Sequence, residues 1–211
     1  MKFFRHDSPI MLFLSDLGDH MLLNILFFIC SLPVFTIGCS LTASFKVARL
    51  LADKSCDHDV PQFFRAFREN FRQSTLLWCP ALIVYAMLIV YYGLSGNEAI
   101  PYMKIWLAGS FCICFLMTAV LCYAFPLISR YDNSLSQHIK NAAILAVTNL
   151  PRTLLLIVIS IFPVLMFVFL PGIFFFILPL WVVMLFSMLT RVCVGIIRPL
   201  FCSIEGETEE K

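Results

Sequence analysis

The sequence has 211 residues, of which 61% are hydrophobic and only 13% are charged, and its formal net charge is +2. A soluble domain is roughly 45 to 50% apolar and about 25% charged, so this chain does not have enough polar surface to cover a core in water. The composition excludes an ordinary water-soluble protein, and the length suits a single membrane domain over residues 1–211.

The first apolar stretch predicts a membrane span at about 17–35 that contains a break. Pro33 and Gly38 interrupt the apolar run, and Thr36 is one of several polar residues around the interruption. We expect a full crossing, and a segment that enters the bilayer and returns to the same side is the alternative. Asn24 is the most polar side chain of this span, and it either lines a substrate path or makes an interhelical hydrogen bond.

An amphipathic helix is predicted at about 60–72, within the first cytoplasmic loop. At about 100° per residue, four aromatic residues fall on one side and three basic residues fall beside them. These residues are Phe63, Phe64, Phe67 and Phe71, with Arg65, Arg68 and Arg72. The helix could lie among lipid headgroups, pack on the protein's own cytoplasmic face, or dock onto a partner membrane protein.

Two further spans are expected at about 74–94 and 105–128. A charge at the middle of a bilayer costs roughly 2.5 to 3.5 kcal/mol, and a crossing takes about 20 residues. Neither 73–97 nor 105–129 contains a charged residue. Each stretch therefore holds one helix.

A second cytoplasmic helix is predicted at about 134–149. Ser134 and Gln137 have the spacing of a capping box, and apolar residues follow at helical intervals until Pro151. The alternative is an extension of the fourth span into the cytosol.

The last charge-free stretch, 153–190, is long enough for nearly two crossings. Pro171 and Gly172 mark a turn near its middle, and Pro is favoured in the first turn of the helix that follows. We therefore predict spans at about 153–170 and 173–194. The expected fold is an all-α, polytopic transmembrane helix bundle of about five spans with amphipathic cytoplasmic helices.

The distribution of Lys and Arg predicts the orientation of the chain. These residues concentrate on the segments 46–72 and 130–152 and in the tail after 190, and positively charged connections remain in the cytoplasm. Five crossings then place the C-terminus inside and the N-terminus outside. A re-entrant first segment would place both ends inside.

Motifs of catalysis and metal binding are missing from the sequence. No nucleophile elbow, zinc-protease motif or phosphate-binding glycine loop occurs. Most of the nine cysteines fall in or beside apolar spans, and the run Cys56, Asp57, His58, Asp59 lacks a second ligand pair with zinc-like spacing. We expect no enzyme activity, no catalytic or metal site, no cofactor and no nucleic-acid partner. The lipid bilayer is the expected contact.

Several separated motifs occur in order along the chain. They are Asn24 with LPVFTIG at 32–38 and LTA at 41–43, FRENFRQST at 67–75, FPLISRYDN at 125–133, and NLPRT at 149–153. Together they resemble the YesL-like family of bacterial integral membrane proteins, whose domain has no known function. The resemblance covers about residues 3–200 in order. It implies a multi-pass protein of the bacterial plasma membrane, with polar candidate residues at helix ends. These are Asn24, Thr36, Gly38, Asn70, Arg130, Asp132, Asn133 and Arg152.

The family carries no established activity, and its members tend to lie beside genes for carbohydrate uptake and its sensing. The resemblance therefore implies a non-enzymatic accessory protein that binds a transporter or sensor membrane protein. The alternative function is a small-solute carrier or channel that uses the broken first span. Structural roles are the competing interpretation for every candidate polar residue.

Overall fold

The computed structural model describes residues 9–53, 59–94 and 103–209, and within these ranges the chain is helical with no strand. The N-terminal half contains α1 (Pro9–Cys30), a short 3₁₀ turn η1 (Val34–Thr36), α2 (Ile37–Ala52) and α3 (Asp59–Leu94). The C-terminal half contains α4 (Met103–Arg130), α5 (Leu135–Thr148), α6 (Leu150–Phe169), α7 (Pro171–Leu180), a π-helical segment η2 (Trp181–Leu185) and α8 (Phe186–Glu209). The predicted all-α class is confirmed.

Five helical stretches of the described chain are long and apolar enough to cross a membrane. They are Val34–Ala52, Val60–Tyr91, Ala108–Arg130, Leu150–Phe169 and Pro171–Cys202. Large apolar side chains such as Ile89, Phe111 and Phe176 are mostly exposed on their outer surfaces. In water such exposure would be costly, whereas in lipid it is favourable. The protein is therefore a helical membrane protein with about five candidate spans.

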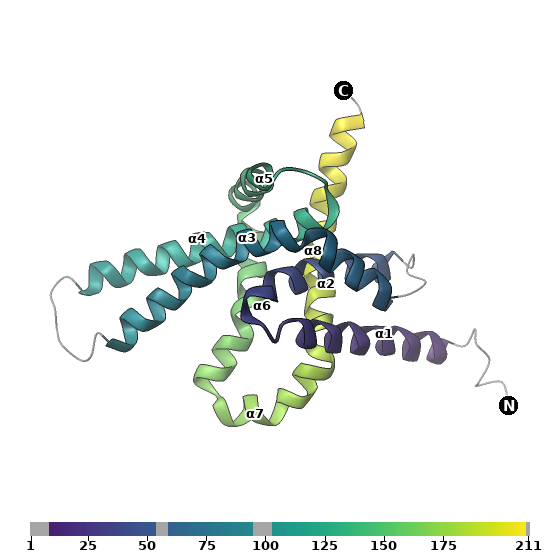
Figure 1. Ribbon diagram of the computed structural model, residues 1–211, viewed down its shortest axis with the longest axis horizontal. Coiled ribbons are helices and arrows are strands. Elements are labelled where there is room, and N and C mark those ends of the chain that lie inside the picture. The colour runs from purple at the N-terminus through teal and green to yellow at the C-terminus, as the bar shows by residue number, and fades with distance from the viewer. Residues whose placement is uncertain (1–8, 54–58, 95–102, 210–211) are drawn as a thin grey trace.

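The N-terminal segments form a helical hairpin, in which α2 runs back along α1 (Figure 1). The predicted span at 17–35 extends beyond α1, which ends at Cys30. The stretch from residue 46, which was predicted to be a loop, contains the last turns of α2. The break has a physical cause, because Pro33 has no N–H to continue a helix. The hydroxyl of Thr36 donates to the carbonyls of Cys30 and Pro33, both at 2.6 Å.

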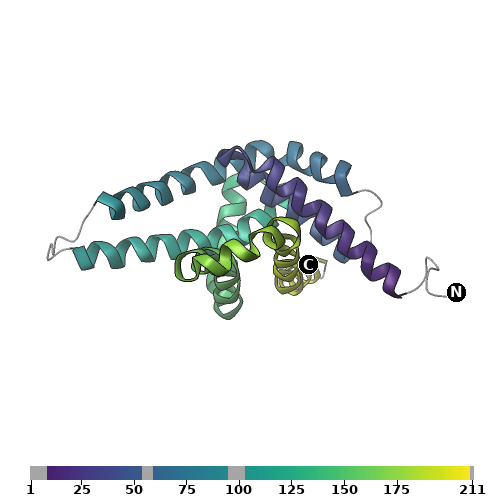
Figure 2. The same cartoon turned by 90° about the horizontal axis from the view of Figure 1, so that it is seen from below.

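A single continuous helix, α3, joins the predicted amphipathic segment 60–72 to the predicted span 74–94. It runs side by side with α4 in both views (Figures 1 and 2). The hydroxyl of Tyr85 in α3 lies 2.8 Å from the hydroxyl oxygen of Thr118 in α4. This hydrogen bond ties the two helices within their apolar length.

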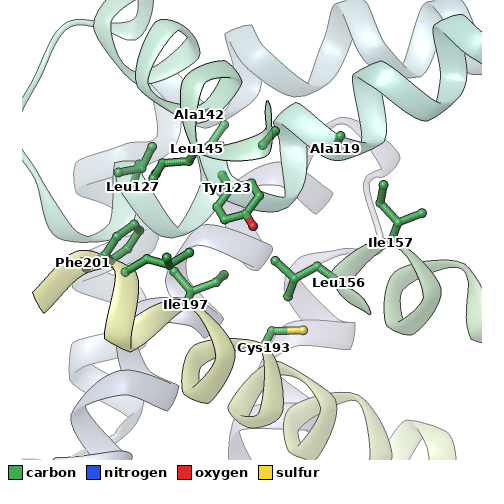
Figure 3. Close-up of a cluster of buried hydrophobic side chains, with 13 residues drawn as sticks. Ala119, Tyr123, Leu127, Ala142, Leu145, Leu156, Ile157, Cys193, Ile197 and Phe201 are labelled. Atoms are coloured by element: carbon green, nitrogen blue, oxygen red, sulfur yellow. The ribbon is translucent and has the colours of Figure 1, made fainter. Parts of the chain in front are cut away.

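The C-terminal half is held by an apolar core around Tyr123 of α4 (Figure 3). Side chains from α5, α6 and α8 surround it, including Leu145, Leu156 and Ile197. The Tyr123 hydroxyl lies 3.1 Å from the hydroxyl of Thr153, which satisfies this polar group within the core. The cluster joins α8 to side chains of α4, α5 and α6, and α8 also contacts α1 and α2 of the N-terminal hairpin.

The sequence correctly predicts where two helices, α5 and α7, begin. The hydroxyl of Ser134 accepts a hydrogen bond from the backbone N–H of Gln137 at 3.4 Å, and α5 begins at the next residue after Ser134. Pro171 occupies the first turn of α7, as its missing N–H favours. The predicted segment 134–149 thus corresponds to a separate helix.

Candidate functional site

A row of polar side chains lies on one face of α1, within an otherwise apolar helix. Asp16, His20 and Asn24 are four residues apart, so they stack along the same side of the helix. His20 and Asn24 are fully buried. Burial of such groups in an apolar surrounding is costly unless they are hydrogen-bonded, so their partners determine what the row does.

Asn24 makes three hydrogen bonds to the backbone around η2. Its side-chain amide N–H groups donate to the carbonyls of Trp181 at 2.8 Å and Val182 at 2.7 Å, and its carbonyl oxygen accepts from the N–H of Ser187 at 2.9 Å. A π-helical turn departs from the regular α-helical bond ladder, and such turns often mark functional positions. Here the Asn24 amide bonds the backbone groups of that turn from a neighbouring helix.

From Asn24 the row of polar residues continues along α1 and α8 to His20 and then to the charged residues Arg191 and Asp16. The Nδ1 atom of His20 lies 2.7 Å from the hydroxyl of Ser187, and its Nε2 atom lies 2.8 Å from a guanidinium nitrogen of Arg191. The same Arg191 nitrogen donates to Asp16 at 2.5 Å. We call Asp16, His20, Asn24, Ser187 and Arg191 the α1–α8 polar chain.

This polar chain changes from partly exposed to buried along its length. The side chains of Asp16 and Arg191 retain 42% and 39% of their exposure, whereas His20, Asn24 and Ser187 have almost none. At the buried end, the rings of Phe27 and Phe186 stack with centroids 3.8 Å apart. The chain therefore joins α8 and the π-helical turn to α1 through buried side chains.

The contacts within the α1–α8 polar chain position α8 on α1. Within the described residues, no group of three or more His, Cys, Asp or Glu side chains could hold a metal ion. Residues 56–58 of the Cys56–Asp59 run lie outside the part of the chain that the structure describes.

Sequence reasoning identified only Asn24 among these five residues. Spans were located by stretches without charge, which left out Asp16 and Arg191, and His20 within the predicted span 17–35 was given no role. The spacing of four residues from Asp16 to His20 to Asn24, matched by Ser187 and Arg191, was the available signal.

The predicted Phe/Arg segment divides cleanly into a buried and an exposed face. Phe63 and Ala66 are completely buried against α2, and Phe67 packs partly beside them. Phe64 and Phe71 retain 48% and 38% exposure. The three arginines of the segment are also exposed, namely Arg65, Arg68 and Arg72. We call Phe64, Arg65, Arg68, Phe71 and Arg72 the α3 outer face.

An ion-pair group borders this face and connects it to α2. Glu69 accepts hydrogen bonds from Arg65 at 2.7 Å and from Lys46 of α2 at 2.9 Å. The Lys46 and Glu69 side chains are 29% and 44% exposed. Exposed pairs of this kind contribute little to stability, so they mainly orient side chains at the rim of the face.

Two candidate residues near the break, Thr36 and Gly38, make contacts that stabilise the fold. Thr36 is buried and bonded to the local backbone. Gly38 lies directly against α3, where an added Cβ would meet Trp78 Cβ at 2.6 Å. The indole N–H of Trp78 donates to the carbonyl of Val34 at 2.9 Å. Gly38 therefore permits α2 and α3 to pack closely, and this packing brings the Trp78 indole to the Val34 carbonyl at the break.

The remaining candidate residues are spread over the molecule rather than joined in one site, and Asn70 lies within the continuous helix α3 instead of at a helix end. Asn70 donates to the carbonyl of Ala66 within α3. Arg130 ends α4, with its guanidinium 5.4 Å from the ring centroid of Phe201. The other candidates are exposed, and they are Asp132, Asn133 and Arg152. The backbone carbonyl of Asn133 accepts a hydrogen bond from Gln73 at 3.0 Å.

Comparison with known proteins adds a family match over part of the chain. A family model described as "Protein of unknown function, DUF624" matches residues 20–92, which extend from α1 to the end region of α3. No curated protein and no solved structure matches the chain. The match covers His20, Asn24, the break and the α3 outer face, and it is similarity to a family whose function is unknown.

Proposed function

We propose that this membrane protein is a non-enzymatic accessory protein, which binds a partner transporter or sensor of carbohydrate uptake through the α3 outer face. The observation that carries the proposal is the exposure of Phe64 and Phe71 beside three arginines, on a helix whose opposite face is buried. The carbohydrate link comes from the resemblance to YesL-like proteins.

The packing of α3 makes its outer face suitable for binding. Phe63 and Ala66 hold the helix on α2, so the exposed residues are presented by a fixed scaffold. Aromatic residues and Arg are enriched at the energetically important positions of protein interfaces. Because the helix itself is held in place, binding does not have to order its backbone, and its aromatic and basic side chains favour a partner with apolar and acidic groups.

The surroundings of the break favour this accessory role over a carrier or channel. A solute path along the first helices would need polar groups that are available to a substrate. Asn24 instead bonds the backbone of η2 and Ser187, and Thr36 bonds the break itself. Of the polar groups at the break, Asn24 and Thr36 are thus engaged within the protein.

We further propose that both chain ends face the cytoplasm of a bacterial cell. The hairpin of α1 and α2 brings the chain back in the direction from which it came (Figure 1). With the segments around 46–72 and 130–152 and the tail inside, nearly all Lys and Arg outside the spans lie on one side. This replaces the outside N-terminus expected from five simple crossings.

A complementation experiment tests the proposed function. In a host strain lacking the protein, carbohydrate uptake and its induction are measured after return of the native chain or of a variant with Arg65, Arg68 and Arg72 changed to Gln. We expect the triple variant to insert normally but to fail in complementation. Lys140→Gln, which changes an exposed cation on α5, is the control and should complement fully.

Photo-crosslinking identifies the partner in the same strain. A crosslinking amino acid at position 64 should capture a subunit of a carbohydrate transporter or a sensor, whereas one at the exposed position 89 farther along α3 should not. Full complementation by the triple Arg variant, together with equal crosslinking from both positions, would contradict the proposal.

A further inference from the structure

The outward side of α5 changes from polar to apolar along the helix. Its first half exposes Ser136, Gln137 and Lys140, whereas its second half exposes Ile144 and Val147, at 61% and 68%. The opposite side of the helix is buried in the apolar core of the C-terminal half. Water solvates exposed polar groups well and exposed apolar groups poorly. The two halves of α5 therefore suit different surroundings.

The apolar half of α5 leads directly into the exposed surface of a candidate span. α6 follows α5 after the single residue Asn149, and its exposed side chains Leu150, Leu154 and Leu155 continue the apolar surface. α6 is one of the helices that are long and apolar enough to cross the membrane. Lipid covers the exposed side of such a helix, so the end of α5 is continuous with a lipid-facing surface.

The carbonyl groups at the end of α5 receive hydrogen bonds from side chains of the protein. The side-chain amide of Asn149 donates to the carbonyl of Leu145 at 3.3 Å, and the Thr153 hydroxyl lies 2.9 Å from the carbonyl oxygen of Ala146. Both carbonyls belong to the last four of the helix, which an α-helix leaves without regular partners. Water satisfies such groups at an exposed helix end, whereas lipid offers no donor. These bonds therefore suit a helix end at membrane depth, and they give both ends of the NLPRT motif at 149–153 a role.

Two cations limit how deep the end of α5 lies. Lys140 precedes Ile144 and Val147 in the sequence and Arg152 follows them, and both cations are exposed. The charged ends of such side chains stay at the level of water and phosphate, while their aliphatic stems extend along apolar surface. The axis of α5 is thereby held near the headgroup plane, with the apolar side chains below it.

We propose that α5 is an interfacial helix of the inner leaflet, with Ile144 and Val147 among acyl chains and Lys140 and Arg152 beside lipid phosphates. Interfacial helices bury their apolar side about 5 to 10 Å into the boundary of headgroups and acyl chains. The leaflet follows from the proposed orientation of the chain, whereas the lipid contact depends neither on that orientation nor on the partner of the α3 outer face. The proposal places in lipid a helix that the sequence assigns to the cytosol.

The accessibility of spin labels in vesicles tests the proposal. The full chain, with its native cysteines removed, carries one nitroxide label at Ile144→Cys, Val147→Cys or Gln137→Cys, and is reconstituted with phosphatidylcholine and phosphatidylglycerol. Collisions of the label with oxygen, which concentrates in lipid, are compared with collisions with a polar nickel chelate, which stays in water. Ile89→Cys on α3 is the lipid reference, and Asp132→Cys is the water reference.

We expect the labels at positions 144 and 147 to follow the lipid reference, with a ratio of oxygen to chelate collisions severalfold above that at position 137. A second measurement keeps the native cysteines. A photoreactive diazirine residue at position 147 should form adducts with lipid, and one at position 137 should form few.

Three results would overturn the proposal. The first is a label at position 144 or 147 that follows the water reference, which would make α5 a cytosolic helix. The second is a low collision rate with both reagents at these positions, which would mean that a second copy of the chain covers the helix. The third is an equal yield of lipid adducts from positions 147 and 137.

Discussion

The side-chain oxygen of Asn24 accepts a hydrogen bond from the backbone N–H of Ser187 at 2.9 Å, across 163 positions of the sequence. The same amide donates to Trp181 and Val182, so one side chain of α1 bonds three backbone groups around a π-helical turn. The Asn24 and Ser187 side chains are buried, and lipid around the part-buried turn offers no hydrogen-bond partner in place of water.

Replacement of Asn24 by Ala should destabilise the protein by about 1 to 2 kcal/mol, because it leaves buried backbone groups without partners. The measurement is thermal unfolding of the purified protein in detergent. Asn133→Ala is the control, since this side chain is exposed and the change retains the backbone carbonyl that Gln73 contacts. Equal melting temperatures of the two variants would contradict a structural role for the Asn24 amide.

Gly38→Ala should destabilise the packing of α2 on α3 by about 1 to 3 kcal/mol. The new Cβ would lie 2.6 Å from Trp78 Cβ and 2.9 Å from the carbonyl oxygen of Ser74, and neither neighbour is the end of a flexible side chain. Gly195→Ala in α8 meets nothing within 4 Å, so it should be neutral or stabilise by up to about 1 kcal/mol. Unfolding in detergent distinguishes the two, and similar effects would refute the close contact at Gly38.

The neighbouring residues Phe63 and Phe64 should respond oppositely to replacement by Ala. Phe63 is fully buried against α2, so its loss should cost about 3 to 5 kcal/mol, whereas Phe64 is 48% exposed and should change stability by less than about 1 kcal/mol. Under the proposed function, only Phe64→Ala reduces partner crosslinking while leaving the fold intact. Equal destabilisation would show that the buried face has been assigned incorrectly.

His138 of α5 should make stability depend on pH. The ring is fully buried, and neither ring nitrogen has a hydrogen bond within the described chain. Burial lowers the pKa of His138, and the backbone of Asn133 and the carboxylate of Asp132 oppose this shift in part. The unfolded chain therefore binds a proton first, as pH falls below about 6.5, and folding stability decreases toward the lower folded pKa.

The melting temperature of the native protein should accordingly fall more steeply between pH 7.5 and 5 than that of His138→Gln, whose side chain does not titrate in this range. The difference between the two slopes isolates His138 from the carboxylates, which titrate in both proteins. Parallel curves would mean that the imidazole does not change its protonation on folding.

The proposed inside position of the N-terminus can be measured by cysteine labelling. Single cysteines replace Ser8, Lys140 or Gly172 in a chain from which all nine native cysteines have been removed. We expect the first two to be protected from a membrane-impermeant reagent in intact cells, and Gly172, at the start of α7, to react. Reaction of the cysteine at position 8 in intact cells would restore the five-crossing topology.

The sequence predicts the helices where charge-free length alone determines them. The spans at 74–94, 105–128, 153–170 and 173–194 correspond to parts of α3, α4, α6 and the α7–α8 region, because a membrane helix needs about 20 apolar residues and little else. Ser134 and Pro171 mark helix starts through local backbone chemistry, which does not depend on the rest of the fold.

The parts that sequence reasoning missed depend on contacts between distant segments. The predicted span ended at about residue 35, yet a second helix, α2, runs from Ile37 to Ala52 because its buried face packs on α3, which lies farther along the chain. The continuity of α3 was missed for a related reason, since the burial of Phe63 on α2 turns a surface helix into an extension of a span. The partners of Asn24 lie on α8 and could not be chosen from spacing alone.

The unbroken length of α3 has a mechanical consequence. Its 36 residues extend about 54 Å, well beyond the roughly 30 Å of a hydrocarbon layer. A force applied at Arg68 would thus be carried along one rod to its far end beside α4. Pro80 removes a backbone hydrogen bond near the middle of α3, so the helix should bend most easily at that turn.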